Sequence, residues 1–143
     1  MRNRMNTKDK ANIAESKVIS DLIASGYTVL IPFGDNERYD VVAEKDGCFV
    51  RIQVKTGRIK NGTIKAKVCS SQAHRGKSHQ HYHGQVEYIC IYEPTSKNTY
   101  MIPIEECGTS EISLRTEQPK KHTKQIRWAK QYLFSFDNKH GHI

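Results

Sequence analysis

Two adjacent residues, Asp46 and Gly47, constrain the fold more strongly than any other feature of the sequence. An Asp-Gly pair between two apolar segments indicates a tight β-hairpin, because both residues tolerate the positive φ angles that such a turn requires. The flanking segments, residues 39–44 and 48–56, are rich in β-branched and aromatic residues, which are typical of strands. We therefore predict two antiparallel neighbouring strands joined at this turn.

The second of these strands has two unlike faces. Side chains alternate along a strand, so Val50, Ile52 and Val54 share one face, which a core can bury. Gln53 and Lys55 share the opposite face. The sequence therefore predicts a polar patch on one side of the hairpin and an apolar surface on the other.

Two carboxylates are expected to join this polar patch. Asp40 lies within the first strand, where a buried carboxylate needs a partner, and Glu15 lies at the margin of the apolar stripe of the preceding helix. Carboxylate and carbonyl oxygens suit a hard cation such as Mg²⁺, and Lys55 can hold or deprotonate a water beside a phosphate. An alternative for Glu15 is a solvent-facing position, or a helical ion pair with Lys8 or Lys17.

The rest of the chain predicts one helix, four further strands and a C-terminal segment that fits two kinds of secondary structure. The helix spans about residues 9–25 and ends at Gly26. Strands are predicted at residues 27–31, at 63–69 as a continuation of the sheet, at 86–92 in its centre, and at 99–104 on an edge. Residues 125–134 fit either a late helix or an extended return. The fold class is therefore α/β, with an N-terminal helix packed on a central mixed β-sheet.

Length and cysteine usage limit the class of protein. A chain of 143 residues has the common size of one domain, so residues 1–143 are expected to form a single domain. Four cysteines, about 20 residues apart and without a CxxC pair, favour a reducing cytoplasm over a disulfide scaffold or a zinc ribbon. No apolar segment is long enough to span a bilayer, so we expect a cytoplasmic protein without membrane contact.

The distribution of charge points to a polyanionic partner. The formal net charge is +8, and basic residues gather in two blocks around a mildly acidic centre. Residues 57–85 hold six basic residues and no acidic residue, and residues 118–143 carry a net charge of +5. These blocks fit a groove that follows phosphates, although a solvated cationic face would give the same count.

Residues 70–85 have no apolar period and are predicted to form an exposed basic loop. The histidines of this loop have a spacing that could hold zinc, but the lack of nearby acids favours contact with phosphates or bases. Tyr82 fits either stacking or packing. We predict contacts to nucleic acid in three places: just before the loop, in the loop, and in the basic C-terminal segment, 118–143. The predicted contacts are Arg58, Lys60, Lys65, Lys67, Gln72, Arg75, Lys77, Lys120, Lys121, Lys124 and Arg127.

The hairpin and its polar residues resemble the PD-(D/E)XK nuclease superfamily, in the branch with a QxK variant that includes an intron-encoded homing endonuclease. The motif is carried by residues 34–42, Gly47 and residues 50–56, and later segments extend the resemblance over residues 8–133. Its order of helix, strand, Asp-bearing strand, turn and QxK strand is the order that this superfamily shows. The resemblance implies a restriction-endonuclease-like core and a DNA endonuclease that hydrolyses phosphodiester bonds with Mg²⁺, or with Mn²⁺ in its place.

The resemblance also implies a role for each site residue. Asp40 would be the metal-ligating aspartate, Gln53 would take the place of the second acid, and the carbonyl of Val54 would add a metal ligand. Lys55 would be the catalytic lysine, and Glu15 matches a helix glutamate of the more distantly similar archaeal Holliday junction resolvases. The neutral amide of Gln53 departs from the superfamily pattern and weakens the attraction for Mg²⁺.

Partners and alternative functions follow from the same resemblance. One site per chain implies a homodimer or tetramer on double-stranded or branched DNA, because two strands must be cut. A structure-specific nuclease similar to the resolvases stays open, as does a DNA-binding protein without catalysis. A metal-dependent enzyme acting on RNA stays open too, because the phosphates of RNA and DNA look alike.

Overall fold

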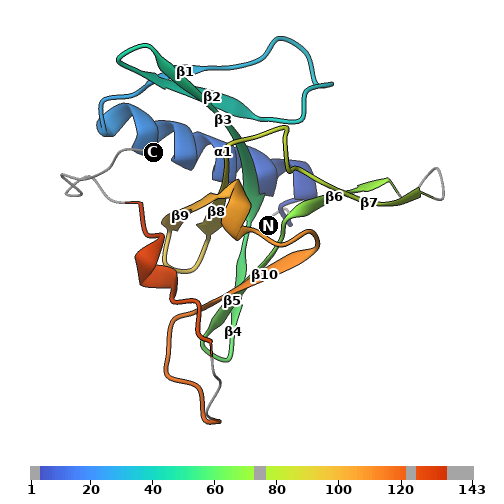
Figure 1. The fold of residues 1–143 in the computed structure, drawn as a ribbon, viewed down its shortest axis with the longest axis vertical. Helices are drawn as coiled ribbons and strands as arrows, with labels where there is room; N and C mark the ends of the chain where they lie inside the picture. The colour runs from blue at the N-terminus through green and yellow to red at the C-terminus, as the bar shows by residue number, and fades with distance from the viewer. Residues whose placement is uncertain (1–3, 73–76, 122–124, 135–143) are drawn as a thin grey trace.

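The computed structural model describes residues 4–72, 77–121 and 125–134, and the side chains of residues 71–72 and 77–79 lie outside this description. Figure 1 shows one long helix lying along a face of a twisted sheet, with smaller sheets on the other side. The five-stranded central sheet has the order β1-β2-β3-β8-β9. The predicted class, an N-terminal helix packed on a mixed sheet, is confirmed.

Helix α1, Thr7–Ala24, forms where the sequence supplies both a cap and an apolar stripe. The side chain of Asn6 accepts a hydrogen bond from the backbone of Asp9, whose carboxylate bonds back to the backbone of Asn6, so the first turn is satisfied at both groups. The helix ends before Gly26, which has a φ of +91°. Ala14, Val18, Asp21 and Leu22 are its buried residues.

The central sheet combines strands β1 (Thr28–Leu30), β2 (Val41–Lys45), β3 (Cys48–Thr56), β8 (Tyr88–Glu93) and β9 (Asn98–Pro103). The hairpin predicted at Asp46 and Gly47 is confirmed: both residues have positive φ, and β2 and β3 are antiparallel. Strand β8 runs parallel to β3, and every other neighbouring pair in this sheet is antiparallel. The predictions of a central strand near residues 86–92 and of an edge strand ending near Pro103 are therefore confirmed.

A second sheet holds β4 (Arg58–Lys60), β5 (Thr63–Lys67) and β10 (Glu111–Arg115), in the order β10-β5-β4. The prediction that residues 63–69 continue the central sheet is wrong. Strand β3 lies between β2 and β8, and the chain that leaves it at Gly57 passes into a separate sheet. Strand β5 folds back on β4 instead, and β10 joins its free edge.

The predicted exposed loop at residues 70–85 is wrong in part. Strand β6, Cys69–Gln72, pairs antiparallel with β7, Lys77–His81, and this hairpin projects from the body at the right of Figure 1. Backbone hydrogen bonds make these strands, which explains why the side-chain pattern gave no sign of them. Tyr82 and Val86, directly after the hairpin, are buried in the core.

The central sheet has an apolar cluster on each face. The cluster on the helix side joins α1 to β2, β3, β8 and β9, with Val18, Val41, Ile52 and Cys90 among its members. The other joins β8 and β9 to the second sheet and to the segment after β7, and includes Ile64, Ile89, Tyr82, Tyr100 and Leu114. Because both faces of β8 and β9 are covered, these strands are apolar on both sides.

Gly57 joins the central sheet to the second sheet. Its N–H donates to the carbonyl of Tyr92 at 2.7 Å, and the next residue begins β4. A Cβ at this position would lie 2.8 Å from a methyl carbon of Ile91 and 2.9 Å from a methyl carbon of Ile64. The close approach of the two sheets therefore requires glycine here.

The C-terminal segment is an extended return with a single helical turn, so of the two predicted alternatives the extended one holds. The described part contains the 3₁₀ helix η3, Ala129–Gln131, and two isolated bridges, Arg115 with Trp128 and Tyr100 with Leu133. A further 3₁₀ helix, η2, spans Ile104–Glu106. None of the helices that the structure describes combines the length and the apolar character needed to cross a membrane.

Candidate active site

Asp40 directly precedes β2, at the point where the β2–β3 pairing stops and β3 continues with β8 as its neighbour. It was predicted inside the strand, but β2 begins at Val41, so Asp40 is the residue before it. The N–H of Asp40 donates to the carbonyl of Ile52 at 2.9 Å, and its carboxylate Oδ2 accepts the N–H of Val54 at 2.9 Å. A side chain thus takes the place of the next strand residue. Beyond Ile52 the β2 side of β3 has no strand partner among the described strands, and we call this unpaired stretch of strand edge the gap.

Val54 and Gln53 border this gap. The N–H and the carbonyl of one strand residue point to the same side, so the carbonyl of Val54 is directed toward Asp40 as well. The Nε2 atom of Gln53 lies 3.4 Å from that carbonyl oxygen. An amide group can turn over, which would present its oxygen to the gap in place of its nitrogen.

Lys55 is held at the far end of the same strand by two contacts. Its Nζ donates to the carbonyl of Cys69 at 3.3 Å and lies 5.0 Å from the centre of the Tyr82 ring. One of its three N–H groups thus donates to the protein backbone. The side chain is half-buried, so its charge acts on the gap with little screening.

Glu15 reaches this site from α1, where its side chain is half-buried. Burial raises the pKa of Glu15, and the negative charge of Asp40 raises it further. Burial also raises the pKa of Asp40, against the opposite effects of the Val54 N–H and the Lys55 ammonium. The surroundings of both carboxylates therefore disfavour the charged form, and the two groups are close enough for the charge of Asp40 to act on Glu15.

The donor set fits a hard divalent cation. Glu15 and Asp40 supply carboxylates, Val54 a carbonyl and Gln53 an amide oxygen, and such oxygens are the ligands that Mg²⁺ prefers. A cation would also relieve the desolvated charges that raise the pKa of both carboxylates. Over the described ranges no three His, Cys, Asp or Glu residues gather as a metal cluster.

Of the four histidines of the zinc site considered from the sequence, the structure describes the side chains of His81 and His83. The rings of His81 and His83 meet edge to face at 5.2 Å, and the backbone of His83 donates to Nδ1 of His81. Nε2 of His83 lies 3.1 Å from the carbonyl of Gly108. Two of the four ring nitrogens, Nδ1 of His81 and Nε2 of His83, therefore have partners within the protein. The side chains of the other loop histidines, at positions 74 and 79, lie outside the described residues.

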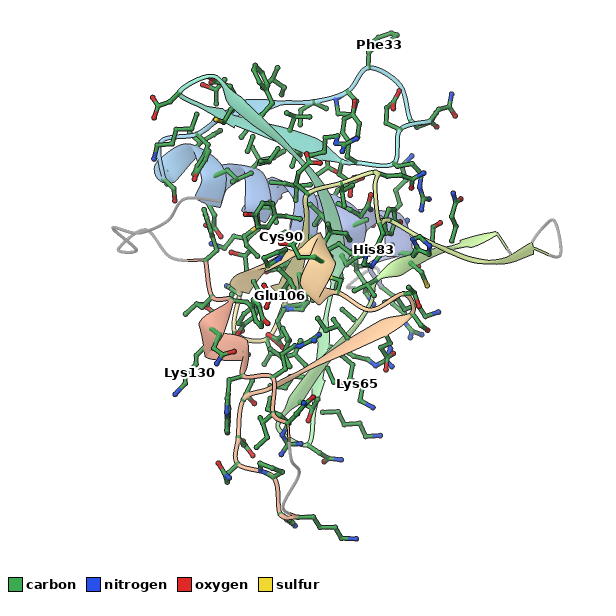
Figure 2. All side chains as sticks on the ribbon, in the orientation of Figure 1. Phe33, Lys65, His83, Cys90, Glu106 and Lys130 are labelled. Atoms are coloured by element: carbon green, nitrogen blue, oxygen red, sulfur yellow. The ribbon has the colours of Figure 1, made fainter. Side chains whose placement is uncertain are left out.

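The predicted nucleic-acid contacts fall into three groups. Arg58, Lys60, Lys65 and Lys67 are all exposed on the second sheet, which we call the basic face, and Figure 2 shows Lys65 extending into solvent. Arg58 has an acidic neighbour, since its guanidinium lies 3.7 Å from the carboxylate of Glu111.

The remaining contacts are placed less completely. Lys120, Lys121 and Arg127 are exposed, and Arg127 borders a concave surface of about 570 Å³ together with Arg115. Gln72 lies on β6 and Lys77 on β7, but the structure does not describe their side chains. Arg75 and Lys124 lie outside the described residues.

Arg38 is a residue near the site that the sequence did not single out. It comes two residues before Asp40 and donates to Ser70 Oγ at 2.7 Å and to Gln85 Oε1 at 2.7 Å. Its guanidinium also lies 4.1 Å from the centre of the Tyr82 ring. No signal in the sequence indicated this role, because arginine is common in polar turns and the partners of Arg38 are far away in the sequence.

The fold is that of a known class of nuclease. The sequence model of the PD-(D/E)XK endonuclease family matches residues 5–135. The chain belongs to this family, and its helix on a mixed central sheet is the restriction-endonuclease-like fold. The protein is therefore a nuclease of the PD-(D/E)XK type, as the sequence motif predicted.

Two solved structures are similar to the chain. A bacterial homing endonuclease has 26% sequence identity and a TM-score of 0.74, over 90% of this chain and 89% of that chain. Hjc, a Holliday junction resolvase from Archaeoglobus fulgidus, has 15% identity and a TM-score of 0.45, over 74% of this chain and 84% of that chain. A search of curated proteins gives no match.

Proposed function

We propose that the protein is a Mg²⁺-dependent endonuclease that hydrolyses phosphodiester bonds of DNA at specific sites. The observation that supports this proposal is the hydrogen bond of Asp40 to Val54 beside the Gln53 amide, together with the charge of Lys55, which acts on Asp40. Site specificity is supported by the similarity to a homing endonuclease over nearly the whole of both chains. A DNA substrate implies that the protein acts inside the cell.

In this proposal Asp40, Gln53, the Val54 carbonyl and Glu15 hold the cation. A bound divalent cation supplies positive charge that stabilises the negative charge developing on the phosphate. The N–H of Val54 fixes one oxygen of Asp40, which leaves the other oxygen to face a ligand. The carboxylates therefore need no large rearrangement before they bind.

Lys55 acts on the water and the phosphate. Its ammonium, held by the carbonyl of Cys69, can donate to a phosphate oxygen and keep the attacking water in line. The barrier falls because the group that orients the water is already in place before DNA arrives. The basic face, Arg58, Lys60, Lys65 and Lys67, supplies contacts to phosphates on either side of the cut.

One site per chain cuts one strand, so we propose that two copies act together on a duplex. A symmetric homodimer places two equivalent sites on two antiparallel strands, which is the symmetry of the duplex backbone itself. A tetramer would contain two such pairs.

The test is a gel assay of the purified protein with Mg²⁺. It offers a supercoiled plasmid that carries the native genomic flanks, beside a labelled four-way junction. Two variants are compared: Lys55→Ala, and the matched control Lys97→Ala, which removes an exposed lysine from the turn between β8 and β9.

Discrete duplex cuts by the wild type and by Lys97→Ala, but not by Lys55→Ala, are the expected result. Symmetric nicks in the junction alone would reassign the protein to the structure-specific nucleases. Retarded but intact DNA in every lane would overturn the proposed cleavage of these DNAs, favour a protein that binds them without cutting, and make Gln53 the residue to examine first.

A further inference from the structure

The ring of Tyr82 lies beside two cations. The guanidinium carbon of Arg38 is 4.1 Å from the ring centre, and the Nζ of Lys55 is 5.0 Å from it. Both distances are within the range in which a cation is attracted to the face of an aromatic ring. Tyr82 itself is buried, with 3% of its surface exposed, so low solvent screening strengthens both contacts.

Arg38 fastens the segment before Asp40 to the root of the β6–β7 hairpin. Besides Ser70 and Gln85, its guanidinium donates to the carbonyls of Gln80 at 3.2 Å and His81 at 3.0 Å. One side chain therefore bonds both strands of the hairpin and the turn that follows it. The hairpin cannot move relative to the Asp40 segment without breaking several of these bonds.

Lys55 is tied to the same assembly through its two contacts. The carbonyl that receives its N–H belongs to Cys69, the first residue of β6, and its ring partner is Tyr82, directly after β7. A lysine has four rotatable side-chain bonds and would otherwise sample many positions. Both of its anchors therefore come from the two ends of the hairpin.

We propose that Tyr82 is the positioning residue for Lys55, and that Arg38 keeps Tyr82 and the β6–β7 hairpin in register with Asp40. This inference rests on the proposed function of Lys55 and deepens it. The hairpin then sets the position of the lysine as well as offering a surface to DNA. A shift of the hairpin on binding would move Lys55 relative to Asp40.

The aromatic ring, rather than the hydroxyl group, is the part of Tyr82 that matters here. Tyr82→Phe keeps the ring, whereas Tyr82→Leu removes it and keeps an apolar side chain. Tyr100→Leu is the matched control, because Tyr100 is buried in the same apolar cluster and contacts neither cation among the described interactions. Thermal unfolding is measured for both leucine variants. All further measurements are then made well below the two unfolding temperatures, so that both variants are folded.

The first measurement is the NMR shift of the Lys55 Cε protons, which does not depend on activity. A ring face shifts nearby protons upfield, so we expect an upfield signal in the wild type, in Tyr82→Phe and in Tyr100→Leu. Tyr82→Leu should move the signal to the position of exposed lysines. An unchanged Lys55 signal in Tyr82→Leu would overturn the proposed contact.

The second measurement is the single-turnover rate with Mg²⁺, beside DNA affinity measured with Ca²⁺, on the substrate cut in the gel assay. Tyr82→Leu and Arg38→Met should cut about 10- to 100-fold more slowly, with affinity changed by less than the rate. Tyr82→Phe and Tyr100→Leu should keep the wild-type rate.

The two proposals fail in distinguishable ways. If Lys55→Ala cuts as fast as the wild type, the function proposed for Lys55 is wrong. If Lys55→Ala is inactive while Tyr82→Leu keeps the full rate, the positioning proposal alone is overturned.

Discussion

The carboxylate of Asp40 accepts the backbone N–H of Val54 at 2.9 Å, and this bond closes the end of the β2–β3 ladder. The bond fixes the carboxylate, but it does not compensate for its burial, because the pKa of Asp40 is still raised. The site is thus preorganised at the expense of stability, which is a common property of catalytic groups.

The first prediction follows from the sign of that shift. A carboxyl whose folded-state pKa is raised holds its proton longer in the native state, so native stability falls as the pH rises through its ordinary pKa toward the raised value. Asp40→Asn keeps an acceptor for Val54 but carries no charge. Without divalent cations, urea denaturation at pH 7 should show the variant at least as stable as the wild type, and the difference should shrink in acid. A variant clearly less stable at pH 7 would contradict this.

Divalent cations should reverse that order. A ligand at 10 times its dissociation constant stabilises the native state by about 1.4 kcal/mol, so Mg²⁺ should raise the Tm of the wild type by several degrees. Asp40→Asn should show no such rise. Gln53→Glu adds an anion to the ligand set and should lower the Mg²⁺ concentration needed for the same rise, as differential scanning fluorimetry would measure. Equal Mg²⁺ responses in all three proteins would place the cation elsewhere.

Glu15 should respond to the charge of Asp40. The negative charge of Asp40 is one cause of the raised pKa of Glu15, so Asp40→Asn should lower that pKa toward its ordinary value. Burial remains in the variant, so the pKa stays above the ordinary value. The measurement is a pH titration of the ¹³C carboxyl signal of Glu15. Asp46→Asn, in the exposed hairpin turn, is the control and should leave the titration unchanged.

The basic face should set the salt dependence of DNA binding. Each lysine that contacts a phosphate contributes about 0.9 to the slope of log affinity against log salt. Lys65→Gln and Lys67→Gln should each reduce the slope by about that amount, whereas Lys97→Gln should not. Fluorescence anisotropy with a duplex in Ca²⁺ over a range of KCl would measure all three. An unchanged slope in both β5 variants would remove this face from the DNA interface.

Asp21 should matter for stability alone. Its buried carboxylate accepts from Lys17 Nζ at 2.7 Å and from Thr99 Oγ1 at 2.8 Å, and so joins α1 to β9. Asp21→Asn leaves one acceptor for two donors and should lower the free energy of unfolding by about 2 kcal/mol. Chemical denaturation would measure the loss, and single-turnover cleavage should be unchanged.

The sequence was most informative where local rules decide the structure. Strand β3 was predicted with its observed bounds, because its alternation and the Asp46-Gly47 turn are both properties of a short segment. Asp40, Gln53 and Lys55 belong to that same hairpin, so their approach to one another could be predicted from spacing. Their chemical roles stay predictions until they are tested.

The remaining structure depends on contacts between distant segments. Nothing within residues 63–67 says that both edges of β3 are occupied, so the second sheet could not be predicted from them. The β6–β7 hairpin has no apolar alternation and is fastened by Arg38, which lies far away in the sequence. Such pairings are set by tertiary context rather than by propensity.

Gly57 has a consequence for the geometry of cutting. Lys55 and Arg58 are three residues apart, which is about 10 Å along an extended chain. The backbone between them therefore limits the distance between their side chains. Side chains of Ile64 and Ile91 fill the space where a Cβ of residue 57 would lie, so the two sheets meet closely at this link. In the proposed function, this short link sets the offset between the phosphate on which Lys55 acts and the phosphates that the basic face binds.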